Sequence, residues 1–429
     1  MMTVNIITLG CSKNLVDSEH LLAQFRASGY NVLHDDYKTK ADIVIINTCG
    51  FILDAKEESV DTILAYMEEK RRGNLRKLFV MGCLSERYKD DLKNEMPDVD
   101  GFFGVWELPR ILEAAGSKLD QHLLTDRVVT TPAHYAYLKI SEGCNRTCAF
   151  CAIPGIRGQQ QSIPIEALLQ ESKNLANRGV KELILIAQDL TNYGIDLYQK
   201  RALPDLLREL VRIPELKWIR LHYAYPTGFP EEVIELMASQ EKICNYLDIP
   251  IQHINDEILS AMGRGHDRKK LEYLLDKFRA KVPDVTLRTT VLTGFPGETQ
   301  EAFDELMDFL SEFKFDRLGV FPYSHEEGTP AYKNYEDHIP EKTKSGRAEA
   351  IMELQQEISL RLNQDRIGKS FRVLIDREEE GFYVGRTQYD SPEVDNEVLI
   401  PADHNLTIGN FYQVKISGAE EFDLYGIVE

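Results

Sequence analysis

The first third of the chain alternates short apolar runs with longer amphipathic segments. The apolar runs have the length of buried strands, and the segments between them carry apolar positions at helical spacing. Strands are predicted at residues 4–9, 43–47 and 77–81, and helices at 16–28, 54–71 and 85–94. This β-α-β-α order predicts a doubly wound parallel sheet with helices on both faces.

A second β/α series follows a linker at residues 130–134, where a proline interrupts regular structure. Apolar runs again alternate with helical segments, which predicts a full or partial parallel barrel with functional residues at the carboxyl ends of its strands. The predicted strands are 136–140, 182–187, 218–224, 246–249, 285–293 and 317–323.

The pattern changes once more after a long helix predicted at 343–365. Short alternating strands separated by turn residues predict a small antiparallel β-barrel of the oligonucleotide-binding type. Its strands are expected at 370–376, 381–387, 396–400, 411–417 and 425–428. The sequence thus predicts an α/β protein with domains at 1–130, 131–365 and 366–429.

Composition narrows the cellular setting. No apolar run reaches the length of a membrane span, and the first residues lack the basic region of a signal peptide, so a cytoplasmic protein is expected. Seven cysteines in a reducing compartment favour metal or redox chemistry over structural disulfides. With 50 Lys and Arg against 70 Asp and Glu, the net charge of −20 favours a basic partner over a polyanion.

The strongest chemical signal is the spacing C-x-x-x-C-x-x-C of Cys144, Cys148 and Cys151, directly after the first predicted barrel strand. Three thiolates on one short loop hold three irons of a 4Fe–4S cube and leave the fourth iron open. An open iron can chelate S-adenosylmethionine (SAM), and one electron then releases a 5′-deoxyadenosyl radical. Zinc is the alternative, but it prefers four ligands and no second C-x-x-C pair lies nearby.

Three further cysteines, Cys11, Cys49 and Cys83, each lie just past a predicted strand of the first domain. The carboxyl ends of parallel strands form a ligand crevice, so these cysteines can converge on one spot. Taken alone they are equally compatible with small packed core residues. Cys244 stands apart from the other six and is expected to be an ordinary packed cysteine.

With these motifs the chain resembles the methylthiotransferase branch of the radical SAM enzymes over nearly its whole length. The matching segments are 10–14, 47–52, 82–84, 143–151, 294–299, 323–324 and 328–331. The resemblance implies a second 4Fe–4S cluster on Cys11, Cys49 and Cys83, whose free iron carries the sulfur to be transferred. It also implies an electron donor and a second SAM that supplies the methyl group. No side-chain acid or base is demanded, so none is assigned.

Contacts to SAM are predicted from position in the barrel. The segment after the second barrel strand lacks the Gly-Gly-Glu that many radical SAM enzymes use for the SAM amino group. Gln188 or Asp189 can substitute, although Asp189 is equally suited to capping the following turn. Gln252 and Arg288 are candidates for ribose and carboxylate contacts, and equally for hydration of the barrel mouth.

A Gly/Pro loop and two histidines also belong to the predicted barrel. Gly294 and Phe295 belong to a loop placed for the adenine, which by sequence alone is only a turn. His222 and His253 show no ligand spacing and are interpreted as structural.

The charge of the last domain bears on the substrate. Two branches of the resembling family share this architecture: one modifies an adenosine of transfer RNA, the other the β-carbon of an aspartate in a small-subunit ribosomal protein. Residues 367–429 contain five Lys and Arg against thirteen Asp and Glu, a net charge of −8. An acidic barrel is a poor clamp for phosphates and a good dock for a basic protein, although acidic surfaces also serve solubility.

Local motifs agree with that charge. Residues 153–158 and 391–395 resemble the ribosomal-protein branch. We therefore expect a basic small-subunit ribosomal protein as partner, free or assembled, without stable binding to nucleic acid or membrane. The alternatives are transfer RNA adenosine methylthiolation and an iron–sulfur electron carrier without SAM chemistry.

Overall fold

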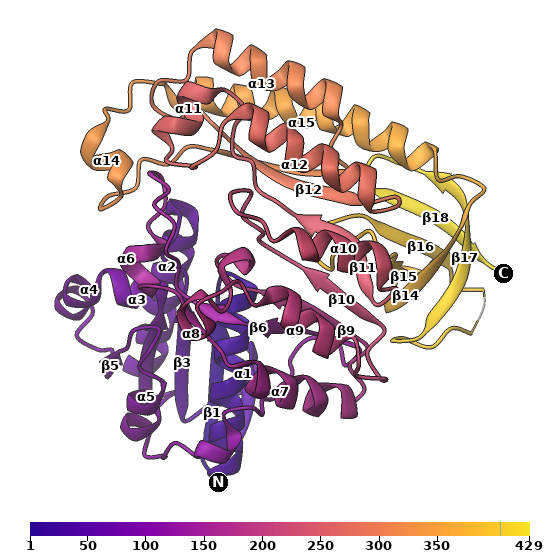
Figure 1. Cartoon of the computed structure of the whole chain (residues 1–429). Helices are drawn as coiled ribbons and strands as arrows, with labels where there is room; N and C mark the ends of the chain where they lie inside the picture. The colour runs from indigo at the N-terminus through magenta and orange to yellow at the C-terminus, as the bar shows by residue number, and fades with distance from the viewer. Residues whose placement is uncertain (404) are drawn as a thin grey trace. The chain divides into compact units, whose positions relative to one another are not determined.

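Figure 1 shows the computed structural model of the chain, which describes residues 1–403 and 405–429. The chain packs as two compact units. The first consists of Met1–Thr131, Tyr137–Arg146 and Cys151–Asn174, and the second of Pro132–Ala136, Thr147–Phe150 and Leu175–Glu429. Within the described residues, no helix is long and apolar enough to cross a membrane.

The first unit is built on the predicted doubly wound parallel sheet, with strand order β2-β1-β3-β4-β5. Alternate residues of each strand point to opposite faces, so Val4 and Ile6 enter one core while Ile7 enters the other. The strands are β1 (Thr3–Thr8), β2 (Asn31–His34), β3 (Ile43–Thr48), β4 (Lys77–Gly82) and β5 (Gly101–Phe102).

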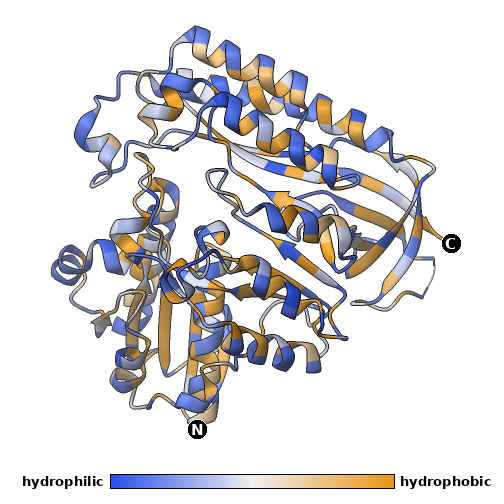
Figure 2. Ribbon diagram, viewed as in Figure 1, coloured by the Kyte–Doolittle hydropathy of each residue, from blue (hydrophilic) through white to orange (hydrophobic). Residues whose placement is uncertain are grey.

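Helices cover both faces of this sheet, as a parallel sheet requires. Apolar side chains of α1 and α5 pack on one face, and those of α2, α3 and α4 pack on the other; the strands are largely orange in Figure 2. The bounds are α1 (Ser12–Ala27), α2 (Leu53–Arg71), α3 (Cys83–Arg87), α4 (Lys89–Glu95), α5 (Leu108–Ala115), η1 (Gln121–Leu123), α6 (Ile153–Arg157) and α7 (Ile165–Asn177), with a hairpin of β7 (Ser141–Glu142) and β8 (Gln161–Ser162).

A second parallel sheet has the strand order β13-β12-β11-β10-β9-β6 and is the predicted partial barrel. The strands are β6 (Tyr135–Lys139), β9 (Glu182–Ile186), β10 (Trp218–Leu221), β11 (Ile243–Asp248), β12 (Thr286–Thr293) and β13 (Arg317–Pro322). The helices are η2 (Leu190–Asn192), α8 (Ile195–Tyr198), α9 (Leu203–Leu210), α10 (Glu231–Ser239), α11 (Asp256–Ala261), α12 (Arg268–Lys281), α13 (Gln300–Phe313), α14 (Pro330–Asn334) and α15 (Glu341–Gln364). The long helix α15 packs along β12 and β13.

The last strands close into the predicted small barrel, in the order β14-β15-β16-β18-β17. Neighbours pair antiparallel except β16 with β18, which run parallel. Inward-facing residues such as Val373, Ile375 and Val414 fill the interior, while Leu374 on the opposite face of β14 is buried against Trp218 and Tyr246. The bounds are β14 (Ser370–Glu379), β15 (Phe382–Arg386), β16 (Glu397–Pro401), β17 (Phe411–Ala419) and β18 (Asp423–Val428).

A buried ion network fastens this small barrel to the parallel sheet within the second unit. Glu182 on β9 accepts from Arg220 on β10 at 2.8 Å and pairs with Arg386 on β15 at 2.8 Å. Arg386 also pairs with Asp376 at 2.6 Å. Burial raises the pKa of a carboxyl group, but here Arg386 and Arg220 outweigh it and lower the pKa of Glu182. The network is therefore charged as well as buried.

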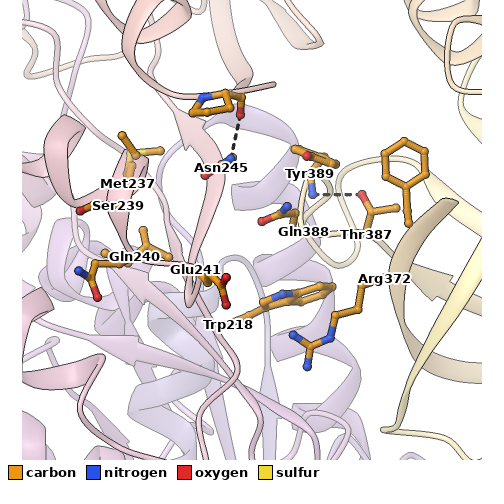
Figure 3. A pocket seen from close by; sticks show the side chains of 14 residues that line it. Trp218, Met237, Ser239, Gln240, Glu241, Asn245, Arg372, Thr387, Gln388 and Tyr389 are labelled. Carbon is orange, nitrogen blue, oxygen red and sulfur yellow. Dashed lines mark hydrogen bonds between the residues drawn. The ribbon is translucent and has the colours of Figure 1, made fainter. Parts of the chain in front are cut away.

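A cavity of about 350 Å³ lies beside this junction (Figure 3). It is lined by the first residues of β10 and β11, Trp218 and Ile243, and by Arg372 and Tyr389 of the small-barrel region. Asn245 donates to the carbonyl of Pro283 at 2.8 Å on its wall. Because these residues stand at the amino ends of the strands, the cavity is at the opposite end of the sheet from the expected reaction site.

Candidate functional site

Cys11, Cys49 and Cys83 follow β1, β3 and β4 at one edge of the first unit's sheet. A Cβ atom placed on Gly10 would lie 2.8 Å from Cys49 Cβ, and one on Gly50 would lie 2.8 Å from the carbonyl carbon of Cys83. The three turns therefore pack against one another with no room for a side chain at these glycines. The structure brings together the cysteines that the sequence placed at strand ends.

Polar side chains hold these turns in place. Asn14 donates to the carbonyls of Leu9 and Thr48, at 2.9 and 3.1 Å, and so ties the end of β1 to the end of β3. Ser59 on α2 accepts from the Cys49 amide at 3.1 Å and donates to the Cys49 carbonyl at 3.0 Å. The backbone around the cysteines is thus fixed without using their sulfur atoms.

A buried arginine reaches the sulfur of Cys83. Arg157, at the end of α6, is 1% exposed, and its Nε and Nη2 donate to Cys83 Sγ at 3.3 and 3.2 Å. Its Nη2 also donates to Asn14 Oδ1 at 2.5 Å. Burial raises the pKa of Cys83 to about 11, and Arg157 works against that rise. The guanidinium favours the thiolate that metal binding needs.

Acidic side chains in the same unit balance the charge of Arg157. Its Nη1 donates to Glu142 at 2.7 Å, and Lys139 donates to Glu142 at 2.7 Å and contacts Asp17. Burial raises the pKa of Glu142, but Lys139 and Arg157 outweigh it and hold that pKa far below its usual value. A charged pair therefore orients the arginine toward Cys83.

The ends of the cysteine loop belong to the first unit. The Cys144 amide donates to the carbonyl of Gly158 at 3.0 Å, and the Arg146 amide donates to Cys144 Sγ at 3.4 Å. Gly143 has a φ of +78°, and a Cβ there would lie 2.3 Å from the carbonyl oxygen of Gln159. The loop thus leaves the β7–β8 hairpin through a turn that only glycine fits.

The tip of the loop, residues 147–150, belongs to the second unit. The Ala149 amide donates to Met262 O at 2.8 Å, and Ala149 O accepts from the Ala331 amide at 2.7 Å. A second buried arginine, Arg264, donates to Cys148 Sγ at 3.3 Å and to Pro250 O at 2.6 Å. These contacts come from residues past the carboxyl ends of β11 and β13, where barrel active sites form.

The donor set of the first unit fits an iron–sulfur cube. In the described residues, no group of three or more His, Cys, Asp or Glu side chains is arranged to hold a single metal ion. A four-iron cube binds each thiolate through a different iron, so its ligands stand farther apart than those of one ion. The three cysteines on adjoining turns, with Arg157 donating to the Cys83 sulfur, would supply one thiolate to each of three irons of such a cube.

The predicted SAM contacts have different surroundings in the second unit. Gln188 is half-buried two residues past β9, while Asp189 caps η2 by accepting from the Thr191 amide at 2.8 Å. Gln252 has a left-handed φ of +70°, and its backbone bridges to β12 at Val291. Both glutamines lie at carboxyl ends of strands, whereas Asp189 performs the turn-capping role that its sequence also allowed.

The Gly294–Phe295 turn is packed against protein side chains. The Gly294 amide donates to Glu298 Oε2 at 2.8 Å, and a Cβ on Gly294 would lie 2.2 Å from Lys344 Cγ. The ring of Phe295 is fully buried and meets Tyr323 edge-on. The adenine contact assigned to this turn stays a prediction.

Arg288 is the third residue of β12, near the amino end of that strand, and its guanidinium lies between two carboxylates. Its guanidinium is 3.4 Å from Asp248 and 3.3 Å from Asp395. Asp395 also accepts from the Tyr246 hydroxyl at 2.7 Å. Two carboxylates thus engage Arg288, and its contact with SAM stays a prediction.

Sequence reasoning missed the two arginines that donate to cysteine sulfur. Arg157 lies in the segment 153–158, whose sequence indicates only a resemblance to the ribosomal-protein branch. Apart from the preceding Gly263, nothing in the sequence around Arg264 indicates a contact with a cysteine. Cys244 is fully buried beside Trp218 and Tyr246, as expected of a packed cysteine. His253 is fully buried, and its Nδ1 accepts from the Asn255 amide at 3.0 Å.

Comparison with known proteins matches three regions of the chain to protein families. The radical SAM superfamily matches residues 138–310, the uncharacterized protein family UPF0004 matches 3–104, and the TRAM domain matches 367–428. A solved radical S-adenosylmethionine methyltransferase, TsrM from Kitasatospora setae, aligns with a TM-score of 0.56 at 15% identity, covering 90% of this chain and 80% of that one. The fold and these matches define a radical SAM protein with a C-terminal TRAM domain.

Two relatives narrow the class. The ribosomal protein uS12 methylthiotransferase RimO of Flavobacterium psychrophilum is 57% identical over 99% of this chain and 97% of its own length. RimO of Christiangramia forsetii is 54% identical over 99% of this chain and 93% of its own. The chain belongs to the RimO family of methylthiotransferases.

Proposed function

We propose that this chain adds a methylthio group to the β-carbon of an aspartate in ribosomal protein uS12, using two 4Fe–4S clusters and two SAM molecules per turnover. The observation that carries the proposal is the presence of two separate cysteine sets, Cys11, Cys49 and Cys83 on adjoining turns, and Cys144, Cys148 and Cys151 on one loop. The identity of 52–57% to relatives named uS12 methylthiotransferase supports the substrate.

The chemistry divides between the bound groups and the chain. When bound, the cluster on the loop cysteines supplies the radical from SAM and the second cluster supplies the sulfur. Gln188 and Gln252 are the proposed SAM contacts, because both lie at carboxyl ends of strands in the second unit. The chain's own task is to orient the reactants and exclude water, with no acid or base required.

The acidic small barrel is the proposed docking surface for the basic uS12 protein. The buried Asp390 and the largely buried Asp376 pair with arginines, so they do not add to the outward charge. Glu378, Glu379 and Glu380 at the β14–β15 turn are exposed, and Glu379 forms a solvent-exposed pair with Arg377 at 2.7 Å. Complementary charge steers a basic partner and repels RNA phosphates, which favours uS12 over transfer RNA.

The setting of the proposed reaction is the cytoplasm, where reduced iron–sulfur clusters persist and ribosomal subunits are present. An external electron donor is required because each SAM cleavage consumes one electron. An electron carrier without SAM chemistry is not favoured, because relatives of full length are named methylthiotransferases.

The test is anaerobic turnover of the cluster-reconstituted chain with SAM, sulfide and a strong reductant. Two substrates run in parallel, a peptide of the aspartate-bearing uS12 loop and unmodified transfer RNA, with methylthiolation read by mass spectrometry. We expect product on the peptide. Product on transfer RNA alone would overturn the substrate, and intact SAM with no product would overturn the radical chemistry.

Charge reversal tests the docking surface in the same assay. The triple substitution Glu378→Lys, Glu379→Lys and Glu380→Lys is expected to raise KM for uS12 about tenfold, since three rim charges each contribute about 0.5 kcal/mol. The control is Glu232→Lys, an exposed acid on α10 of the second unit, which should leave KM unchanged. An unchanged KM in the triple variant would place the docking surface elsewhere.

A further inference from the structure

Each cysteine set contains one sulfur that accepts from a buried arginine. In the first unit, Arg157 donates two N–H groups to Cys83 Sγ, at 3.3 and 3.2 Å. In the second unit, Arg264 Nη1 donates to Cys148 Sγ at 3.3 Å. Both arginines are nearly inaccessible, with exposures of 1% and 4%. Burying a guanidinium is costly without an anionic partner; Glu142 is one such partner of Arg157, and a cysteine thiolate would be a further one at both positions.

Neighbouring groups fix the direction of each guanidinium. Arg157 is held from its other side by Glu142 at 2.7 Å and by Asn14 at 2.5 Å. Arg264 donates to Pro250 O at 2.6 Å, and its guanidinium stacks over the ring of Tyr225 at 4.2 Å. The Tyr225 hydroxyl donates back to Arg264 O at 2.7 Å. Neither arginine needs to move to reach its sulfur.

We propose that Arg157 and Arg264 are positioning residues that set the reduction potentials of the two clusters, one arginine for each. The proposal rests on the proposed function, because it takes Cys83 and Cys148 as cluster ligands. Hydrogen bonds to cluster sulfur are one of the main determinants of iron–sulfur potentials. Here the donors are cations, which makes the hydrogen bonds stronger than neutral ones.

The sign of the effect follows from charge. Reduction adds one negative charge to a cluster that already carries thiolate ligands. A buried guanidinium beside one thiolate stabilises the reduced form more than the oxidised form. Each arginine therefore raises the potential of its own cluster, and removing it makes that cluster harder to reduce. At buried distances of about 3.3 Å, salt screens this interaction only weakly.

The two clusters are measured separately in the full-length chain. Cys144→Ala, Cys148→Ala and Cys151→Ala together leave the cluster of the first unit, and Cys11→Ala, Cys49→Ala and Cys83→Ala leave the other. In each background, Arg157→Met and Arg264→Met are titrated anaerobically, with the reduced cluster followed by EPR. Each arginine variant is the matched control for the other, since both remove a buried guanidinium.

The expected result is a crossed pattern. Arg157→Met shifts the reduction equilibrium of the first unit's cluster tenfold to a hundredfold toward the oxidised form, about 59 to 118 mV at 59 mV per tenfold change, and leaves the other cluster unchanged. Arg264→Met does the reverse. A shift under threefold, about 28 mV, in the partnered cluster would overturn the proposal. Equal shifts in both clusters would also overturn it, because they would report a general loss of structure.

If a methionine variant loses its iron, a second measurement tests whether each arginine contacts its cluster. The unsubstituted chain is labelled with arginine that carries ¹⁵N only in its guanidinium group, because the Arg146 amide also donates to Cys144 Sγ at 3.4 Å. The labelled chain is reduced and examined by pulsed EPR for a ¹⁵N coupling to each cluster. We expect a coupling from both clusters. Absence of the coupling contradicts the proposal for that cluster. If the unsubstituted chain binds no iron at all, the proposed function itself fails, whereas reducible clusters without arginine coupling refute only this inference.

Discussion

Replacing Glu182 tests how the small barrel is fastened to the parallel sheet. Glu182 is fully buried and carries the negative charge between Arg220 and Arg386, each 2.8 Å away and each almost fully buried. Glu182→Ala leaves two buried guanidiniums facing each other with one carboxylate, Asp376, for compensation. Removing one partner of a buried ion pair costs about 3–5 kcal/mol, and the expected loss of unfolding free energy is in that range.

The chain offers its own reporter for this change. Trp218 lies at the junction, edge-on to Phe411 of the small barrel at 4.8 Å. The chain has two tryptophans, so Trp106→Phe leaves Trp218 as the fluorescent probe of unfolding in guanidinium chloride. With a denaturant slope of about 4 kcal/mol/M, a loss of 3–5 kcal/mol lowers the midpoint by about 1 M.

Two comparisons make the result decisive. Glu182→Gln keeps the shape and one acceptor, and we expect about half the loss. Glu232→Ala removes a partly exposed pair with Arg208 and should cost less than about 1 kcal/mol. A Glu182→Ala midpoint within 0.25 M of the parent, about 1 kcal/mol, would refute the conclusion that this carboxylate neutralises the two arginines.

Three more predictions address the cysteine turns, the Asp395 loop and acid stability. Gly10→Ala should displace Cys49 and remove the iron of the first unit's cluster. Gly29 has a similar left-handed backbone but open space around it, so Gly29→Ala should keep the iron. Iron analysis of the two reconstituted variants distinguishes these outcomes. Asp395→Asn should weaken the Trp218 transition by about 1–3 kcal/mol, measured in the same denaturant assay, and an unchanged midpoint would contradict the role of its charge. Burial lowers the pKa of His253 to about 4, with Glu305 opposing and Arg347 adding to the shift. In the unfolded chain the pKa of this imidazole is about 6.5, so between pH 6.5 and 4 the unfolded chain binds a proton at His253 that the folded chain does not. Stability is therefore full above that pH and falls between pH 6.5 and 4, by at most about 1.4 kcal/mol per unit, and His253→Gln should flatten this part of the stability profile.

Much of the fold could be predicted from the sequence because the central strands of the parallel sheets are buried on both faces and read as apolar runs. Residues 43–46 form an unbroken apolar run followed by Asn47 and Thr48, and the whole strand, residues 43–48, is buried. By contrast, β2 is half-exposed at the sheet edge and β5 has two residues, so neither leaves a periodic signal. Packing against β1 and β4 creates these strands, and a local pattern does not contain that information.

The candidate site likewise has one part that the sequence predicts, the cysteines, and one part that it does not predict, the two arginines. The positions of Cys11, Cys49 and Cys83 after strands predicted their convergence, because parallel strands share one carboxyl edge. Nothing local marks Arg157 or Arg264 among the 50 Lys and Arg of the chain. Their role depends on partners that are distant in the sequence: Cys83 is 74 residues from Arg157, and Cys148 is 116 residues from Arg264. Long-range pairing decides which cations are buried.

The measurement that tests the central claim most directly is Mössbauer spectroscopy of the ⁵⁷Fe-reconstituted chain and its two cysteine triple variants. The unsubstituted chain should show two 4Fe–4S clusters. Removing Cys11, Cys49 and Cys83 should abolish one cluster, and removing Cys144, Cys148 and Cys151 should abolish the other, with the remaining cluster unchanged in each case. A single cluster in the unsubstituted chain, or the loss of both clusters from either triple variant with its fold intact, would contradict two independent cysteine-held clusters.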